Sequence, residues 1–130
     1  MLEDPLADDW KAWKSLNEKL GNSVIIVGDD LLATNAKLLD RAIKEKTCTG
    51  ILVKPNQIGT VIETLQVVKL AKAHNFKVNV SHRSGETTDT FIADFAVGVQ
   101  SDYVKFGAPA RGERTAKYNR LLEIANELTV

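Results

Sequence analysis

The sequence lacks several features that would place it in a special class of protein. Its single cysteine, Cys48, cannot form a disulfide within the chain. No apolar run approaches the ~20 residues that a membrane-spanning helix needs, and the first residues lack the pattern of a signal peptide. These absences predict a cytoplasmic protein that does not enter a membrane.

An excess of charge of one sign is also missing. Seventeen Lys and Arg residues balance seventeen Asp and Glu residues. A balanced chain has no long-range field that would draw it onto nucleic acid or an anionic membrane. We therefore expect neither of these as a partner, although a local basic site remains compatible with the composition.

The composition that is present is that of an ordinary folded domain. The chain has 130 residues, of which 44% are hydrophobic and 26% are charged. This length and apolar content suit one compact core. Because no stretch has the composition of a linker or a low-complexity segment, we expect residues 1–130 to form a single α/β domain.

Helical and strand patterns alternate along the chain. Helical spacing of apolar residues occurs at 10–20, after the potential cap Asn35, and at 60–74, 88–97 and 113–128. Short strand-like runs occur at 23–27, 51–53, 77–80 and 103–106. Four strands that alternate with helices predict a parallel sheet, either an open doubly wound sheet or part of a (β/α)8 barrel.

Polar residues gather where the predicted strands end. In both architectures the ligand site lies along the carboxyl edge of the sheet, and the helices that follow attract anions at their amino termini. The repeated pattern predicts one shared site. The clusters are Gly28-Asp29-Asp30, Lys54-Pro55-Asn56-Gln57, Ser81-His82-Arg83-Ser84 and Lys105.

Each cluster also has an ordinary structural interpretation. A pair of aspartates after a strand is typical of a turn, and a lysine at a strand end is typical of a solvated rim. The loop at 81–84 could be a polar turn with Glu86 or Thr87 as the cap of the next helix. For this loop we favour a function, because an imidazole, a guanidinium and a hydroxyl near a helix start suit a phosphate group.

Five motifs together resemble enolase (phosphopyruvate hydratase), in the order found in that family. The resemblance covers essentially the whole chain but only the carboxyl-terminal part of an enolase. It implies half of a (β/α)8 enolase-type barrel, with four βα units that dimerise or rearrange to an open parallel sheet, because half a barrel leaves strand edges unpaired. The motifs are EDPL (3–6), GDDLLATN (28–35), KPNQIGT (54–60), SHRSGET (81–87) and KFGAPARGERTAKYN (105–119).

The resemblance also implies a reaction, the magnesium-dependent dehydration of 2-phosphoglycerate to phosphoenolpyruvate in glycolysis. The third magnesium carboxylate and the acid that helps to expel the hydroxyl are expected outside this sequence, so this lyase activity is expected to be weak or absent without the amino-terminal half. The implied residues are Lys54 as the base, His82, Arg83, Ser84 and Lys105 as substrate-binding groups, and Glu3 and Asp29 as Mg²⁺ ligands.

Three functions are compatible with these residues. The chain is a shortened or split enolase that acts once a partner, such as a complementing enolase half, supplies the missing carboxylates, while a homo-oligomer would cover the open strand edges. Alternatively, it binds 2-phosphoglycerate or phosphoenolpyruvate without turnover. In the third interpretation it is a structural or regulatory protein that binds enolase through an exposed barrel face.

Overall fold

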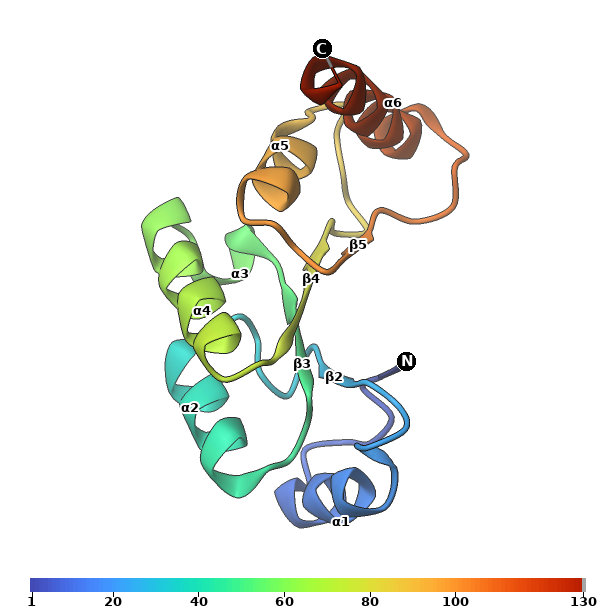
Figure 1. Cartoon of the computed structure of the whole chain (residues 1–130). Coiled ribbons are helices and arrows are strands. Elements are labelled where there is room, and N and C mark those ends of the chain that lie inside the picture. Colours follow the sequence, from blue (N-terminus) through green and yellow to red (C-terminus); the bar gives the residue numbers. More distant parts are fainter. Residues whose placement is uncertain (130) are drawn as a thin grey trace. The chain divides into compact units, whose positions relative to one another are not determined.

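The computed structural model describes residues 1–129. The chain divides into two compact units, which we call unit 1 (Met1–Asn79) and unit 2 (Val80–Val130). Strands and helices alternate in both (Figure 1). In chain order they are β1 (Leu2–Glu3), α1 (Trp10–Leu20), β2 (Ile26–Gly28), α2 (Ala36–Glu45), β3 (Gly50–Val53), α3 (Pro55–Ile58), α4 (Val61–Ala73), β4 (Lys77–Ser81), α5 (Phe91–Gly98), β5 (Tyr103–Lys105) and α6 (Gly112–Leu128).

The strands of unit 1 form a parallel arrangement. β1 pairs with β2 so that Leu2 lies opposite Ile26, and β2 pairs with β3 so that Val27 lies opposite Gly50. The first residue of β4 continues this order, since the Lys77 N–H donates to the Thr49 carbonyl at 2.9 Å. All residues of β2 and β3 are buried, as expected for parallel strands covered by helices.

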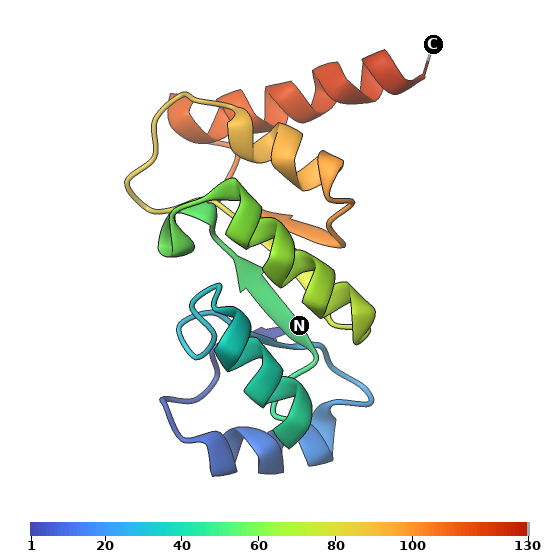
Figure 2. The same ribbon diagram turned by 90° about the vertical axis from the view of Figure 1, so that its left-hand side faces the viewer.

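Helices α2 and α4 pack side by side in unit 1 (Figure 2). The predicted cap Asn35 is confirmed, since its side chain accepts hydrogen bonds from the backbone N–H groups of Lys37 and Leu38. Thr60 caps α4 in the same way through Glu63 N–H. These caps fix where each helix starts after its strand, and so they set the shape of the strand-to-helix loops.

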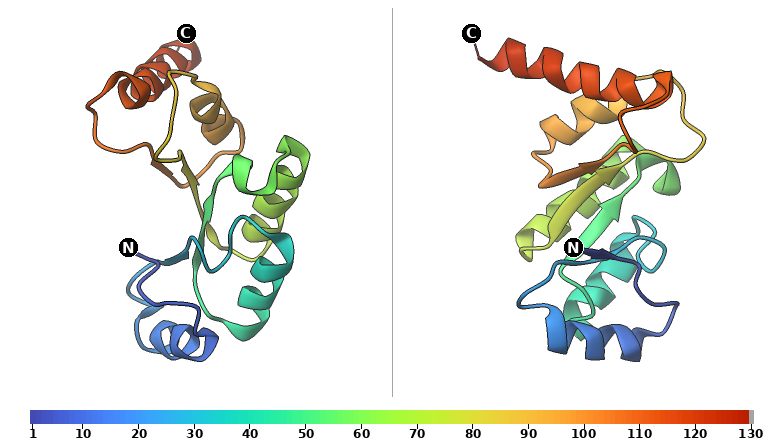
Figure 3. Two further views of the ribbon diagram at one scale, coloured as in Figure 1. Left: turned by 180° about the vertical axis from the view of Figure 1, so that it is seen from behind. Right: turned by 90° about the vertical axis from the view of Figure 1, so that its right-hand side faces the viewer.

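Unit 2 contains the end of strand β4, the whole of strand β5, and helices α5 and α6. The two helices pack against each other (Figure 3). Phe106 is fully buried and meets the ring of Tyr118 edge-on, with 6.0 Å between the ring centroids. Strand β5 is exposed along its length, and Tyr103 and Val104 retain 42% and 37% of their accessible surface. An exposed strand of this kind is available for contact with another chain.

The predicted α/β alternation and the parallel sheet are confirmed, with local differences. The structure adds the two-residue strand β1 and the single-turn helix α3. The predicted strand at 23–27 begins only at Ile26, because the N–H groups of Ser23 and Val24 still bond to the Leu20 carbonyl at the end of α1. The helix predicted at 88–97 begins at Phe91. No helix within residues 1–129 is both long enough and apolar enough to span a membrane.

Candidate active site

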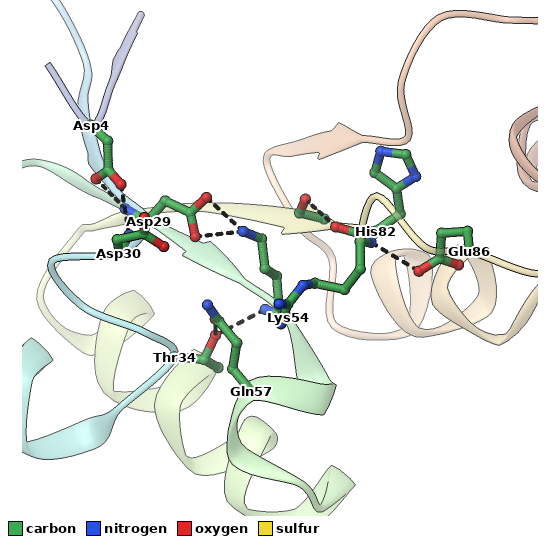
Figure 4. A network of polar contacts seen from close by, with 10 residues as sticks. Asp4, Asp29, Asp30, Thr34, Lys54, Gln57, His82 and Glu86 are labelled. Atoms are coloured by element: carbon green, nitrogen blue, oxygen red, sulfur yellow. Dashed lines mark hydrogen bonds and ion pairs between the residues drawn. The ribbon is translucent and has the colours of Figure 1, made fainter.

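Polar side chains of unit 1 meet just beyond the carboxyl ends of three strands (Figure 4). Asp4 follows β1, Asp29 follows β2 and Lys54 follows β3. Two of these, Asp29 and Lys54, are residues that the sequence analysis proposed for the site. The parallel pairing of the strands brings them to one edge, as expected for this architecture.

Lys54 and Asp29 form an ion pair with two contacts. Lys54 Nζ lies 2.7 Å from Oδ1 and 2.6 Å from Oδ2 of Asp29. The lysine side chain is 12% exposed and the aspartate side chain is 10% exposed. Short charge-assisted contacts with little water around them orient both partners strongly. The Lys54 amine is therefore held in contact with both oxygens of the Asp29 carboxylate.

Asp4 holds the loop that carries Asp29. Its two carboxylate oxygens accept hydrogen bonds from the backbone N–H groups of Asp29 and Asp30, each at 2.7 Å. Asp4 itself has φ = 39°, a conformation that aspartate tolerates better than most residues. Sequence reasoning gave Asp4 no role, although its place directly after Glu3 and a strand-like start could have suggested one.

The carboxylates of unit 1 suit a hard cation. Asp4, Asp29 and Asp30 each offer an oxygen atom, and these atoms lie within 4.8 Å of one another. Glu3, the other predicted ligand, is exposed on β1 next to Asp4 and is not a member of this group of three. Oxygen donors of this kind are the ligands that Mg²⁺ prefers. The residues present therefore fit the magnesium ion implied by the sequence resemblance.

In unit 2, the remaining predicted residues lie at the ends of β4 and β5. The His82 N–H donates to the Lys105 carbonyl at 3.0 Å, which joins the loop after β4 to the last residue of β5. Arg83 and Ser84 follow in the same loop and are exposed. The Arg83 backbone N–H donates to Glu86 Oε1 at 2.9 Å. This loop thus carries a guanidinium and a hydroxyl directly after His82 in the chain.

A buried lysine supports this loop from α6. Lys117 is fully buried, and its Nζ lies 2.9 Å from Glu86 Oε2. The same ammonium donates to the carbonyls of Thr87 at 2.9 Å and Glu113 at 2.7 Å. Sequence reasoning missed Lys117, because a lysine in a charged helix is typical of a solvated surface.

Glu86 is a link in this network and not the helix cap considered above. Helix α5 starts at Phe91, and Thr87, the other cap considered, also lies before this start. Burial alone would raise the pKa of Glu86, but hydrogen bonds from the Arg83 N–H and from Lys117 lower this pKa below its usual value. Glu86 is therefore ionised at neutral pH, as its contact with the Lys117 ammonium requires.

The environment of His82 favours the neutral imidazole. Burial lowers the pKa of His82 below its usual 6.5, and the positive charges of Arg114, Lys117 and Lys105 lower it further, against the opposing effect of Glu86. The buried Nδ1 atom has no hydrogen-bond partner among residues 1–129. His82 therefore has hydrogen-bonding capacity that the described residues do not use.

Strands followed by helices, with charged side chains at the carboxyl ends of the strands, define an α/β domain of the kind found in (β/α) barrels. Comparison with family models gives the particular family. Residues 1–130 match the model described as the enolase, C-terminal TIM barrel domain. The chain belongs to this family, and the resemblance inferred from the sequence motifs is confirmed.

Several bacterial enolases are similar to the chain over almost its whole length. The enolase of Sulfurimonas denitrificans is 58% identical over 128 residues, that of Nitratiruptor sp. 56% over 128 and that of Helicobacter hepaticus 55% over 129. Each alignment covers 98% of this chain but 30% of the relative. The chain thus spans about a third of the length of the curated relatives that it matches.

Proposed function

We propose that the chain supplies the base, part of the magnesium site and the phosphate-binding loop of a cytoplasmic enolase. The reaction is the dehydration of 2-phosphoglycerate to phosphoenolpyruvate, a step of glycolysis. The observation that carries this proposal is the Lys54–Asp29 pair at the ends of adjacent parallel strands. The pair brings a candidate base and a candidate metal ligand to one edge of the sheet, where both can reach a single bound substrate.

In unit 1, Lys54 is the proposed base and removes the proton from the carbon beside the substrate carboxylate. A lysine accepts a proton only in its neutral form. Glu3 and Asp29 are the proposed Mg²⁺ ligands, with Asp4 and Asp30 as neighbouring oxygen donors. A Mg²⁺ ion held by these residues would supply positive charge to stabilise the negative charge that develops on the substrate carboxylate.

In unit 2, Arg83 and Ser84 are the proposed phosphate ligands. A guanidinium matches phosphate oxygens with two parallel hydrogen bonds, and a hydroxyl adds another. His82, as a neutral imidazole, and Lys105 are proposed to contact the remainder of the substrate. The hydrogen bond from the Arg83 N–H to Glu86 supports this assignment, because it fixes the backbone that carries the guanidinium.

A partner is part of the proposal. The third magnesium carboxylate and the acid that helps to expel the hydroxyl come from a complementing enolase half, whereas a second copy of the chain covers unpaired strand edges without supplying these groups. The exposed strand β5 in unit 2 supports contact with another chain, as does Leu2 of β1 in unit 1, which is 37% exposed.

The test is formation of phosphoenolpyruvate from 2-phosphoglycerate and Mg²⁺. The chain is assayed alone and with the part of the Sulfurimonas denitrificans enolase that lies outside the aligned region. We expect turnover with the complement, loss of turnover in Lys54→Ala, and weaker substrate binding in Arg83→Ala. Lys37→Ala, a change at an exposed position of α2, is the matched control.

Three other outcomes contradict parts of the proposal. Substrate binding without turnover favours the non-catalytic binding protein. Binding of intact enolase without substrate binding favours the structural or regulatory protein. Turnover that survives in Lys54→Ala contradicts the role of Lys54 as the base.

A further inference from the structure

A buried hydroxyl lies against the turn that carries Lys54 (Figure 4). Thr34 is fully buried in the loop between β2 and α2. Its Oγ1 accepts a hydrogen bond from the Lys54 N–H at 3.0 Å and donates to Gln57 Oε1 at 2.6 Å. The Gln57 N–H in turn donates to the Lys54 carbonyl at 2.9 Å. These three hydrogen bonds close a ring around the turn from β3 into α3.

The ring connects the two loops that bear the Lys54–Asp29 pair. Asp29 begins the segment that leads to Thr34, and Lys54 begins the segment that leads to Gln57. The Lys54 side chain provides no cap for α3, and Pro55 has no N–H to donate. The Thr34 hydroxyl is therefore the contact that fixes the Lys54 backbone from outside its own turn.

The backbone at Thr34 is strained. Thr34 has φ = 52° and follows Ala33 with φ = 44°. Positive φ is uncommon for any residue other than glycine and is costly for a β-branched one. Asparagine or glycine would suit this conformation better but would not offer the same hydroxyl. The strained backbone at Thr34 therefore carries the hydroxyl that contacts Lys54 and Gln57.

We propose that Thr34, together with Gln57, is a positioning residue. It fixes the Lys54 backbone so that the Lys54 amine stays in contact with the Asp29 carboxylate. The role of Lys54 as a base rests on the proposed function, whereas the positioning itself does not. Displacement of a catalytic group by 1 Å can cost a rate factor of about 10². A hydroxyl that anchors the Lys54 backbone thus affects the chemistry without touching the substrate.

The test compares Thr34→Val with Thr34→Ser in the full chain. Valine keeps the shape and the β-branch but removes the hydroxyl, and serine keeps the hydroxyl. Trace acetylation, read by mass spectrometry, gives the reaction rate of the Lys54 amine relative to the exposed Lys37. We expect Thr34→Val to raise the Lys54 rate several-fold and Thr34→Ser to restore it, with Lys37 unchanged.

Cys48 reports whether unit 1 stays folded in each variant. Its side chain is 3% exposed, and burial raises the pKa of this thiol to about 11, so it reacts with a thiol reagent only when the unit opens. Positioning predicts that the Lys54 rate rises while Cys48 stays protected. If the Lys54 rate is unchanged in Thr34→Val, the proposal is wrong. The proposal is equally wrong if Thr34→Val makes Lys54 and Cys48 reactive together and Thr34→Ser does not return the Lys54 rate to that of the unaltered chain.

Two further measurements keep the test decisive. If Thr34→Val does not fold, Gln57→Met removes the other side-chain contact of the ring, and the same two outcomes apply. In the complemented enzyme, Thr34→Val should lower kcat with little change in KM. Absence of turnover in the unaltered protein would count against the proposed function, whereas unchanged kcat in Thr34→Val would count against the positioning role alone.

Discussion

The two units hold their proposed site residues in different ways. In unit 1 the ion pair is formed by two proposed site residues, the base Lys54 and the magnesium ligand Asp29, and both side chains keep about a tenth of their accessible surface. In unit 2 the corresponding pair lies behind the site, where the fully buried Lys117 holds Glu86, and Glu86 holds the Arg83 backbone. Under the proposed function, the pair in unit 1 serves chemistry, whereas the pair in unit 2 serves structure.

The largest effect on stability is therefore expected from Lys117→Met. Removal of the ammonium leaves the Glu86 carboxylate and two backbone carbonyls with an unfilled partner position, at a cost of roughly 3–5 kcal/mol. The NMR signals of the Tyr118 ring, which packs on Phe106, report urea unfolding of unit 2.

The double variant Lys117→Met/Glu86→Gln is the control for this prediction. It removes both charges and should recover part of the lost stability, whereas Lys11→Met at an exposed position should change little. A Lys117→Met protein as stable as the unaltered chain would show that the buried ammonium does not support unit 2.

Lys54→Met should cost less stability, about 1–3 kcal/mol, because only the Asp29 carboxylate loses its partner, whereas Lys117→Met also leaves two backbone carbonyls without theirs. Both tryptophans, Trp10 and Trp13, lie in unit 1, so their fluorescence follows its unfolding. The double variant Asp29→Asn/Lys54→Met should be more stable than Lys54→Met alone. A larger loss of stability in Lys54→Met than in Lys117→Met would contradict the assignment of the unit 1 pair to chemistry and the unit 2 pair to structure.

Asp4→Asn should have a smaller effect on unit 1. Asparagine tolerates φ = 39° as well as aspartate does, so the change mainly replaces one of the two acceptor oxygens that face the N–H groups of Asp29 and Asp30. We expect a loss of about 1 kcal/mol in the tryptophan unfolding curve. Asp8→Asn, at an exposed position, is the control. Equal stability of Asp4→Asn and Asp8→Asn would show that the Asp4 carboxylate does not support the loop that carries Asp29.

The smallest effect is expected from pH. The pKa of His82 is lowered in the folded state, so folding is favoured by the neutral ring above the unfolded pKa near 6.5 and loses this contribution as pH falls below it. The stability of unit 2 should therefore decrease as pH falls through this unfolded pKa towards the lowered pKa of the folded state. His82→Gln should flatten this dependence, and His74→Gln, in unit 1, should leave it intact. The same slope in His82→Gln and the unaltered chain would contradict the assignment.

The strand ends were the most predictable part of the molecule. Apolar runs followed by Asp29 and Lys54 predicted that these two side chains meet, because parallel strands deliver their carboxyl ends to one edge, and the ion pair in unit 1 confirms this contact. Thr34 and Lys117 could not be predicted in the same way. A threonine before a helix cap and a lysine in a charged helix both have ordinary interpretations, and only the folded geometry shows what their polar atoms contact.

Strand β1 escaped prediction for a related reason. It has two residues, both exposed, and it is defined by pairing with β2 and not by a pattern of its own. The turn from β4 into α5 was predicted too short. The Asp89 side chain accepts a hydrogen bond from the Phe91 N–H, so the helix starts only at Phe91. Local side-chain contacts of this kind decide element boundaries.

The proposed role of Lys54 as a base is tested most directly by exchange of the proton at carbon 2 of 2-phosphoglycerate. In deuterated water with Mg²⁺, the chain together with the complementing enolase part should replace this proton with deuterium, observed as loss of its NMR signal. Lys54→Ala should abolish the exchange, while Lys37→Ala should leave it unchanged. Exchange that continues at the same rate in Lys54→Ala would contradict the account.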